Sequence, residues 1–192
     1  MTLADLRNHF CCSPFLPNHI HELAAVALIF READDDLEIL LIRRADREDD
    51  PWSGHIAFPG GRMSTADHSP QATAERETLE EIGLDLTHYG ECVGSLEPES
   101  PMKRTSGTNL LVVPYLYSLD REPEKYVLNH EVAELFWVRI GPMLLRQNLT
   151  KFHFEHEGRS HVLPGFNVNG HTLWGMSYRM LTRVFSTIEE NL

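Results

Sequence analysis

Two apolar runs near the beginning of the chain predict a pair of β-strands. Residues 23–30 read LAAVALIF and residues 37–45 read LEILLIRRA, with the polar stretch READDD between them. A short continuous apolar run that is bounded by polar residues is typical of a buried strand. The polar stretch is a turn signal, so we expect the two strands to form a hairpin.

Shorter apolar segments predict further strands along the rest of the chain. One short strand is expected in HIAFPGGR, where Pro59, Gly60 and Gly61 interrupt it. Three longer strands are expected in GECVGSL, TNLLVVPYLYSL and HEVAELFWVRI, which begin at residues 90, 108 and 130. Residues 151–166 alternate between apolar and polar positions around a glycine, which predicts a second hairpin.

Helical signals occur in three places. Ser69 and Pro70 are typical of a helix start and Gly83 of a helix end, so they bracket a helix over residues 70–82. A short helix is expected in GPMLLRQN, and a longer one near the end of the chain, where apolar residues recur at helical spacing. Strands and helices together predict an α/β fold with a mixed sheet, in a single domain over residues 1–192.

The net charge of the chain disfavours one class of binding partner. Seventeen basic and 29 acidic residues give a net charge of −12, which disfavours binding to the phosphate backbone of a nucleic acid. The longest apolar run is too short to span a membrane, and no signal-peptide pattern is visible. Three cysteines make a poor disulfide framework, so we expect a cytoplasmic protein. The negative net charge does not exclude a small anionic substrate that is held by a metal ion and a few local arginines.

Three glutamates crowd one face of the helix that is expected over residues 70–82. Glu77, Glu80 and Glu81 are spaced i, i+3 and i+4, where like charges destabilise a helix by roughly 0.2–0.5 kcal/mol per pair. A solvated acidic face is the ordinary explanation of such a cluster. However, this cluster lies beyond the first turn, has no lysine at the compensating spacing, and follows a glycine-rich loop. Carboxylate clusters are what Mg²⁺ or Mn²⁺ requires, and these ions usually act on phosphates.

The order of these parts resembles the Nudix box. Its second half stands here as Arg76-Glu77-Thr78-Leu79-Glu80-Glu81-Ile82-Gly83-Leu84, in which only Thr78 departs from the usual aliphatic residue. The spacing before it is one residue longer than in the general box. That spacing, through Phe58-Pro59-Gly60-Gly61, Asp67 and Thr73-Ala74-Glu75-Arg76-Glu77, resembles the coenzyme A diphosphatase branch, as do residues 129–140 and 172–181.

The resemblance covers about residues 23–185 and implies both a fold and an activity. The fold would be an α/β/α sandwich, and the reaction the metal-dependent hydrolysis of a diphosphate bond in a nucleoside diphosphate derivative. Coenzyme A (CoA) or acyl-CoA is the expected substrate. The alternatives are hydrolysis of ADP-ribose or another nucleoside diphosphate-linked compound and, ranked lower, a non-catalytic ligand sensor of the same fold.

The resemblance also assigns roles to residues of this chain. Glu77, Glu80 and Glu81 would hold Mg²⁺ or Mn²⁺, and Arg76 would orient one of them. Glu97 and Glu99 are candidates for the general base, with Glu131 a weaker one. The substrate-binding candidates are Arg44, Arg47, Trp52, Gly60, Gly61 and Arg62. Three further basic residues could contact substrate phosphates: Arg43, Lys103 and Arg104. A homodimer is left open.

Overall fold

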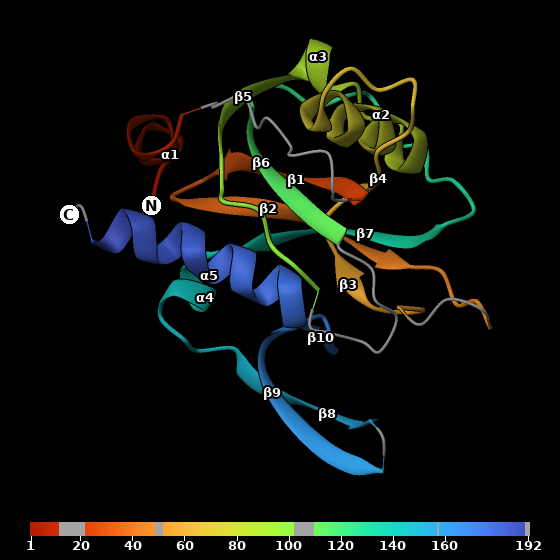
Figure 1. Cartoon of the computed structure of the whole chain (residues 1–192). Coiled ribbons are helices and arrows are strands. Elements are labelled where there is room, and N and C mark those ends of the chain that lie inside the picture. Colours follow the sequence, from red (N-terminus) through yellow and green to blue (C-terminus); the bar gives the residue numbers. More distant parts are fainter. Residues whose placement is uncertain (12–21, 49–51, 102–109, 157, 191–192) are drawn as a thin grey trace.

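The computed structural model describes residues 1–11, 22–48, 52–101, 110–156 and 158–190 of the chain (Figure 1). Its elements are, in chain order, α1 (Leu3–His9), β1 (Glu22–Ala33), β2 (Asp36–Arg44), β3 (Ile56–Ala57), β4 (Gly60–Arg62), α2 (Pro70–Ile82), α3 (Leu86–Tyr89), β5 (Gly90–Ser95), β6 (Leu110–Leu119), β7 (Val132–Arg139), α4 (Gly141–Leu144), β8 (Leu149–His156), β9 (Arg159–Val168), β10 (His171–Trp174) and α5 (Gly175–Glu189).

The larger sheet has seven strands and is mixed. Its strand order is β3-β2-β1-β6-β5, with β4 paired to β1 and β7 paired to β2. β1 and β6 run parallel, whereas the other pairs are antiparallel. The first predicted hairpin is confirmed, because β1 and β2 pair from Phe30 opposite Ile39 to Ala33 opposite Asp36.

Helices cover both faces of this sheet (Figure 1). On one face, α2 and the turn that follows it pack on odd-numbered side chains of β1, such as Ala27 and Ile29. On the other face, α1, α4 and α5 pack on even-numbered side chains, such as Leu28 and Phe30. The run LAAVALIF is therefore apolar throughout because both faces of its strand are buried. The predicted α/β/α sandwich with a mixed sheet is confirmed.

A second sheet of three antiparallel strands has the order β10-β9-β8. Its β8–β9 hairpin, which was predicted from the alternation, extends away from the main sheet in Figure 1. The base of this sheet is anchored in the core, since Phe166, Val168 and Leu173 are almost completely buried next to α5. The periodicity of α5 is also confirmed, because its buried residues include Met180, Val184 and Ile188.

Other features went beyond the sequence predictions. The short elements α1, α3 and β10 were not predicted, and Cys92 on β5 is disulfide-bonded, which the cysteine count did not indicate. In the described ranges, no helix is long and apolar enough to cross a membrane.

The helix α2 has the predicted limits and an unusual buried side. Ser69 caps it by accepting a hydrogen bond from the Ala72 N–H, and Gly83 ends it in the left-handed conformation with φ 70°. Its buried residues are only partly apolar: Pro70, Thr73, Ala74, Thr78, Glu81 and Ile82. A carboxylate therefore occupies the side of the helix that packs on the sheet.

The segment that faces this helix depends on a glycine. Gly60 begins β4, which pairs antiparallel with β1 and places Gly60 opposite Val26. Its φ is 149°, and a Cβ atom at this position would lie 2.2 Å from the carbonyl oxygen of Ala25 and 2.6 Å from the Cα of Val26. Only glycine fits here without moving the backbone of one of the two strands.

We expect Gly60→Ala to destabilise the protein by about 3 kcal/mol or more, because the new methyl group meets backbone rather than a flexible side chain. Thermal unfolding with a second probe of folding measures this. Gly170→Ala is the matched control: its φ is 87° and no atom lies within 4 Å of the new Cβ, so it carries only the conformational cost of about 1–2 kcal/mol. Equal losses in the two variants would contradict the proposed clash.

Candidate functional site

The acidic face of α2 lies against the glycine-rich segment, and its three glutamates differ in exposure. Glu81 is buried at 2% exposure. The Glu77 side chain is 17% exposed and that of Glu80 is 55% exposed. The cluster therefore runs from the interior of the protein to its surface, in the order Glu81, Glu77, Glu80.

Glu81 is a buried carboxylate with a backbone donor. The Gly60 N–H donates to Glu81 Oε2 at 2.9 Å. Burial raises the pKa of Glu81 to about 8; the Gly60 hydrogen bond opposes the shift, the charge of Glu77 adds to it, and Arg44 lowers it. The carboxylate is thus held in a place where its negative charge is costly unless a cation is near.

Glu77 occupies the space that a side chain at position 61 would need. A Cβ atom on Gly61 would lie 2.5 Å from the Cδ and Oε1 atoms of Glu77. Burial raises the pKa of Glu77, while the neighbouring Arg76 lowers it. The two adjacent glycines therefore serve different purposes: Gly60 donates its N–H to Glu81, and Gly61 leaves room for the Glu77 carboxylate.

Arg76 lies at the centre of a carboxylate network. Asp67 binds its guanidinium through two contacts, Nε to Oδ1 at 2.8 Å and Nη2 to Oδ2 at 2.9 Å. Arg76 also forms ion pairs at 3.0 Å with Glu77 and with Glu80. The bidentate pair holds the pKa of Asp67 well below its usual range and raises that of Arg76. Arg76 was predicted to pair with a glutamate, and it pairs with two.

Asp67 is the residue of this site that the sequence assignment left without a role. Its side chain is only 5% exposed. It also accepts hydrogen bonds from the Ser64 N–H and the Thr73 hydroxyl. Asp67 thereby fixes the loop before α2 as well as the guanidinium of Arg76. The position of Asp67 in the longer spacing before the second half of the box was the sequence feature that could have indicated this role.

The fourth glutamate and the unusual threonine of the box have structural explanations. Glu75 points away from the cluster and accepts hydrogen bonds from the Tyr117 hydroxyl at 2.9 Å and the Gln71 amide at 3.0 Å. Thr78 is fully buried, and its hydroxyl donates to the Ala74 carbonyl at 2.7 Å. A polar residue is tolerated at this aliphatic position because the helix itself satisfies its hydroxyl.

The end of β2 and the start of β7 bring further charges to the cluster. Arg44 shares the strand face of Leu40 and Ile42, which pack toward α2, and its charge acts on Glu81. Glu131 raises the pKa of both Glu77 and Glu81, so its carboxylate lies within electrostatic reach of both. Arg47 forms an ion pair of 3.4 Å with Glu131. Arg44 and Glu131 therefore lie within electrostatic reach of the buried carboxylates, and Arg47 lies next to Glu131.

The other substrate-binding candidates in the described residues have partners or positions apart from the three glutamate side chains of α2. Arg43 points to the opposite strand face and pairs with Asp46 and Glu134. Arg62 is exposed, pairs with Glu22, and accepts a hydrogen bond from Arg76 through its carbonyl. Trp52 is 46% exposed in the loop before β3. Lys103 and Arg104 lie outside the described residues.

The two loop glutamates are not placed with the cluster. Glu99 is 8% exposed and pairs with Arg179 at 3.0 Å and Arg183 at 3.1 Å, both on α5. The Glu97 side chain is exposed, and its carbonyl accepts a hydrogen bond from Arg183. Because α5 packs on the sheet face opposite α2, these contacts hold the loop to the other side of the molecule.

The donor set of α2 suits a hard divalent cation chemically, since it consists of carboxylate oxygens in a partly dry environment. Within the described residues, no three His, Cys, Asp or Glu side chains converge as a preformed metal set. Instead, Arg76 forms ion pairs with Glu77 and Glu80, and the Gly60 N–H donates a hydrogen bond to Glu81. A cation would have to compete with Arg76 for two of its ligands.

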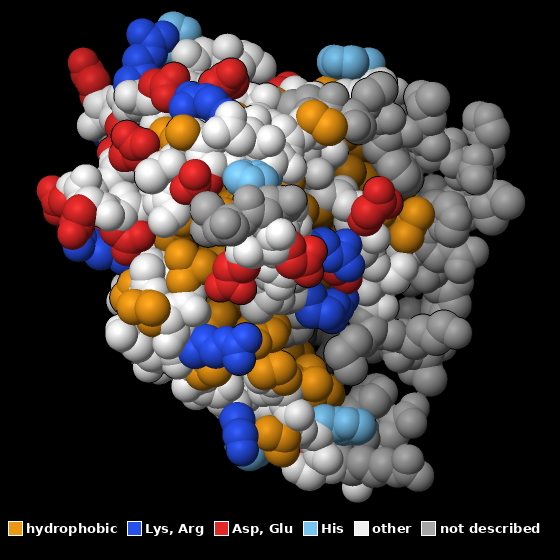
Figure 2. Space-filling view, turned by 90° about the vertical axis from the view of Figure 1, so that its left-hand side faces the viewer, with side chains coloured by type: hydrophobic (Ala, Val, Ile, Leu, Met, Phe, Trp, Pro, Cys, Tyr) orange, Lys and Arg blue, Asp and Glu red, His pale blue; other side chains and the backbone are white. Residues whose placement is uncertain are grey.

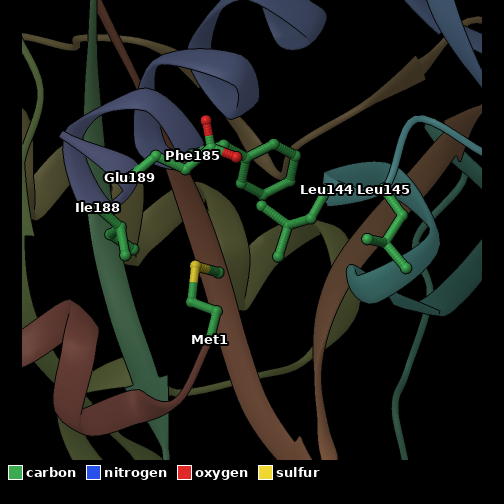
Figure 3. Close-up of a pocket in the computed structure, with 6 residues that line it drawn as sticks. All are labelled: Met1, Leu144, Leu145, Phe185, Ile188 and Glu189. Carbon is green, nitrogen blue, oxygen red and sulfur yellow. The ribbon is translucent and has the colours of Figure 1, made fainter. Parts of the chain in front are cut away.

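A hollow in the described part of the molecule lies elsewhere. Figure 3 shows it between the N-terminus, α4 and the end of α5, with a volume of about 200 Å³. Its lining is mainly apolar: Met1, Leu144, Leu145, Phe185, Ile188 and Glu189. It is on the α5 side of the sheet and so does not belong to the glutamate cluster. On the face shown in Figure 2, acidic and basic side chains are interspersed.

The raised pKa of Glu81 leads to a pH-dependent prediction. In EDTA, folding should become less favourable as the pH rises from about 4, the ordinary pKa of a glutamate, towards about 8. The reason is that the unfolded chain ionises Glu81 over this range while the folded protein holds it protonated. Glu81→Gln removes this penalty and should be more stable than the wild type at pH 7, by on the order of 3 kcal/mol.

Urea denaturation of both proteins at pH 4 and pH 7 measures the effect. The stability difference should nearly vanish at pH 4, where Glu81 is protonated in the folded protein and mostly protonated in the unfolded chain. Glu80→Gln is the control and should change stability little at either pH, because the Glu80 side chain is mostly exposed. A Glu81→Gln protein that is less stable than the wild type at pH 7 would contradict the prediction.

Comparisons with known proteins agree with this arrangement. The model of the NUDIX domain matches residues 21–157. The human mitochondrial coenzyme A diphosphatase NUDT8 is 33% identical over 143 residues, covering 72% of this chain and 58% of that protein. The mitochondrial Nudix hydrolase 15 of Arabidopsis thaliana is 30% identical over 175 residues, covering 87% of this chain and 59% of that protein. This chain thus spans less than two thirds of either relative.

The fold is also shared with solved structures. The NUDIX domain of Shewanella oneidensis NrtR, solved with ADP ribose, superimposes with a TM-score of 0.52 at 18% identity, and the match covers 100% of this chain and 99% of that one. A MutT/nudix family protein from Enterococcus faecalis gives a TM-score of 0.56 at 18% identity, covering 93% of this chain and 64% of that one. Together, the matched domain and the cluster on α2 show that the chain belongs to the Nudix family.

Proposed function

We propose that this chain is a metal-dependent hydrolase of the diphosphate bond in nucleoside diphosphate derivatives, with CoA or acyl-CoA as its substrate. The observation that carries the proposal is the set Glu77, Glu80 and Glu81 on α2, facing the backbone of Gly60 and Gly61. A non-catalytic sensor would have no need to keep all three carboxylates, one of them buried at a cost to stability.

Glu77, Glu80 and Glu81 are proposed to hold Mg²⁺ or Mn²⁺; Nudix hydrolases generally use divalent metal ions. Such an ion, when bound, neutralises charge on phosphoryl oxygens and lowers the pKa of a bound water. Arg76 forms ion pairs with the carboxylates of Glu77 and Glu80, and two hydrogen bonds from Arg76 to Asp67 hold its guanidinium next to them. Arg44 and Arg47 are proposed to bind substrate phosphates through charge-assisted hydrogen bonds. The charge of Arg44 acts on Glu81, and Arg47 pairs with Glu131.

Glu131 is the best placed candidate for the general base. It lies within electrostatic reach of Glu77 and Glu81, whereas Glu99 is engaged by Arg179 and Arg183 on the opposite side of the sheet. A base must come within hydrogen-bond reach of the water that it deprotonates, directly or through one further water. We therefore propose Glu131 ahead of Glu97 and Glu99, which were the candidates preferred from the sequence.

Two observations support CoA as the substrate. The longer spacing before α2 places Asp67 where it binds Arg76 with two hydrogen bonds, so the spacing has a structural purpose in this chain. The relative NUDT8 is named a coenzyme A diphosphatase. The second candidate is ADP-ribose or another nucleoside diphosphate-linked compound, which the NrtR domain solved with ADP ribose makes worth testing.

Two further expectations stay predictions. One domain over residues 1–192 is compatible with the shared core on both faces of the main sheet. A cytoplasmic location was expected from the sequence, although the two named relatives are described as mitochondrial.

We expect Glu81→Gln to lower kcat by on the order of 10²-fold or more with Mg²⁺ or Mn²⁺, because a metal ligand is lost. Glu131→Gln should also lower kcat and remove the acidic limb of its pH profile. Glu99→Gln is the matched control, a buried carboxylate on the other side of the sheet, and should keep the pH profile. Steady-state kinetics on the folded variants measures this, and near-normal turnover of Glu81→Gln would rule out the proposed ligand.

The same metal site can be tested without turnover. Mg²⁺ or Mn²⁺ should raise the melting temperature of the EDTA-treated wild type in a concentration-dependent way, because the cation binds only the folded cluster. The double variant Glu77→Gln/Glu80→Gln should gain clearly less. If both proteins gain equally, the cation that stabilises them binds at another site.

The identity of the substrate can be tested with the 3′-phosphate of CoA, which dephospho-CoA lacks. CoA should be hydrolysed to 4′-phosphopantetheine and adenosine 3′,5′-bisphosphate at least about tenfold faster, as kcat/KM, than dephospho-CoA. The reason is that a charge-assisted contact from Arg44 or Arg47 to the 3′-phosphate is worth roughly 1.5–3 kcal/mol. Arg44→Ala should remove this preference, and Arg43→Ala, on the opposite strand face, should keep it. Faster cleavage of ADP-ribose than of both would overturn the CoA assignment and leave the family assignment intact.

A further inference from the structure

The β8–β9 hairpin leaves one strand edge open. In the three-stranded sheet, β9 lies in the middle, and within the described residues β8 pairs only with β9. The hairpin extends away from the main sheet (Figure 1). An unpaired strand edge of this length is a template for another strand, and proteins usually cover it or protect it with charge.

The two faces of the hairpin have different side chains. One face is aromatic: Phe152 and Trp174 stack with ring centres 3.9 Å apart, and Phe154 lies next to both. The other face carries Lys151, His153 and Glu155, all exposed. This alternation fixes which side of the sheet each residue of β8 occupies, whatever strand is added to its edge.

The charges of β8 are self-complementary. His153 lies midway between Lys151 and Glu155. If a second copy of β8 pairs antiparallel, with His153 opposite the same residue of the other copy, Lys151 of each copy lies opposite Glu155 of the other. Phe152 of each then lies opposite Phe154 of the other. Moving the centre to Phe152 would place Lys151 opposite His153 and remove both Lys–Glu pairs, so charge disfavours that register.

The backbone of β8 permits the same register. His156 and Arg159 pair across a two-residue connection, in which Gly158 has φ 71°. In such a hairpin the flanking residues exchange hydrogen bonds, and antiparallel pairs alternate between bonded and non-bonded. Even-numbered residues of β8 therefore bond to β9, and odd-numbered residues direct their N–H and C=O groups outward. His153, at the centre, is odd-numbered.

We propose that β8 is a dimerisation edge, through which two copies of this chain join their three-stranded sheets around a two-fold axis at His153. The interface is isologous, as a two-fold axis requires, and its partner is a second copy of this chain. Lys151 and Glu155 form two symmetric ion pairs on one side of the joined sheet. On the other side, Phe152 and Phe154 of both copies make the aromatic face continuous. This inference is independent of the catalytic proposal.

Sedimentation equilibrium of the wild type, in a concentration series reaching about 200 µM, should show a reversible monomer–dimer equilibrium. Lys151→Glu should weaken the dimer at least about tenfold, because it turns both ion pairs into repulsive pairs. Combining Lys151→Glu with Glu155→Lys should restore dimerisation, since opposite charges again face each other. Lys125→Glu is the matched control: it makes the same change of charge on an exposed lysine outside the hairpin.

A backbone variant tests the edge itself. His153→Pro removes an outward N–H and should abolish the dimer while circular dichroism shows a folded protein. A wild type that stays monomeric over the whole series overturns the proposal. So does a dimer that survives both Lys151→Glu and His153→Pro, because another surface must then join the copies. Failure of the double charge exchange to restore the dimer overturns the register.

Discussion

The buried carboxylate of Glu81 is the constraint around which the candidate site is arranged. It occupies the sheet-facing side of α2, where an apolar residue would normally stabilise the helix packing. A buried carboxylate needs a hydrogen-bond donor, and the Gly60 N–H supplies it at 2.9 Å. That bond requires β4 to run close to α2 and to β1, which only glycine allows at position 60. The same approach brings the adjacent Gly61 against α2, where the absence of a side chain leaves room for the Glu77 carboxylate.

The sequence predicted the parts of the fold that are decided locally. The limits of α2 follow from Ser69, Pro70 and Gly83, and the two-sided burial of β1 follows from its unbroken apolar run. The elements that were missed are short and depend on tertiary contacts. β10 has four residues and is defined by its pairing with β9. The first helix, α1, has only two buried residues, although Thr2 and Asp5 form a capping box that was a readable signal.

The sequence also predicted which charged residues of α2 share one face. It did not predict the direction of charged side chains in the loops. The spacing of Glu77, Glu80 and Glu81 predicted a common face, and the helix provides it. Loop residues have no such period. Glu99 was attractive as a base because it follows the box, yet its carboxylate binds two arginines that are 80 and 84 positions later in the chain. Glu131, at a greater distance from the box in sequence, is the carboxylate whose charge acts on Glu77 and Glu81.

The pair of Asp67 and Arg76 has a consequence for how strongly this protein could bind a cation. Arg76 acts as an internal counter-ion for Glu77 and Glu80, so a metal ion would displace a guanidinium group and not only water. The strength of the metal site would then depend on how readily Arg76 gives up Glu77 and Glu80, and Asp67, which already binds the guanidinium, would keep it paired when it does. A residue with no metal contact of its own would in this way set the concentration of free cation at which the protein becomes loaded.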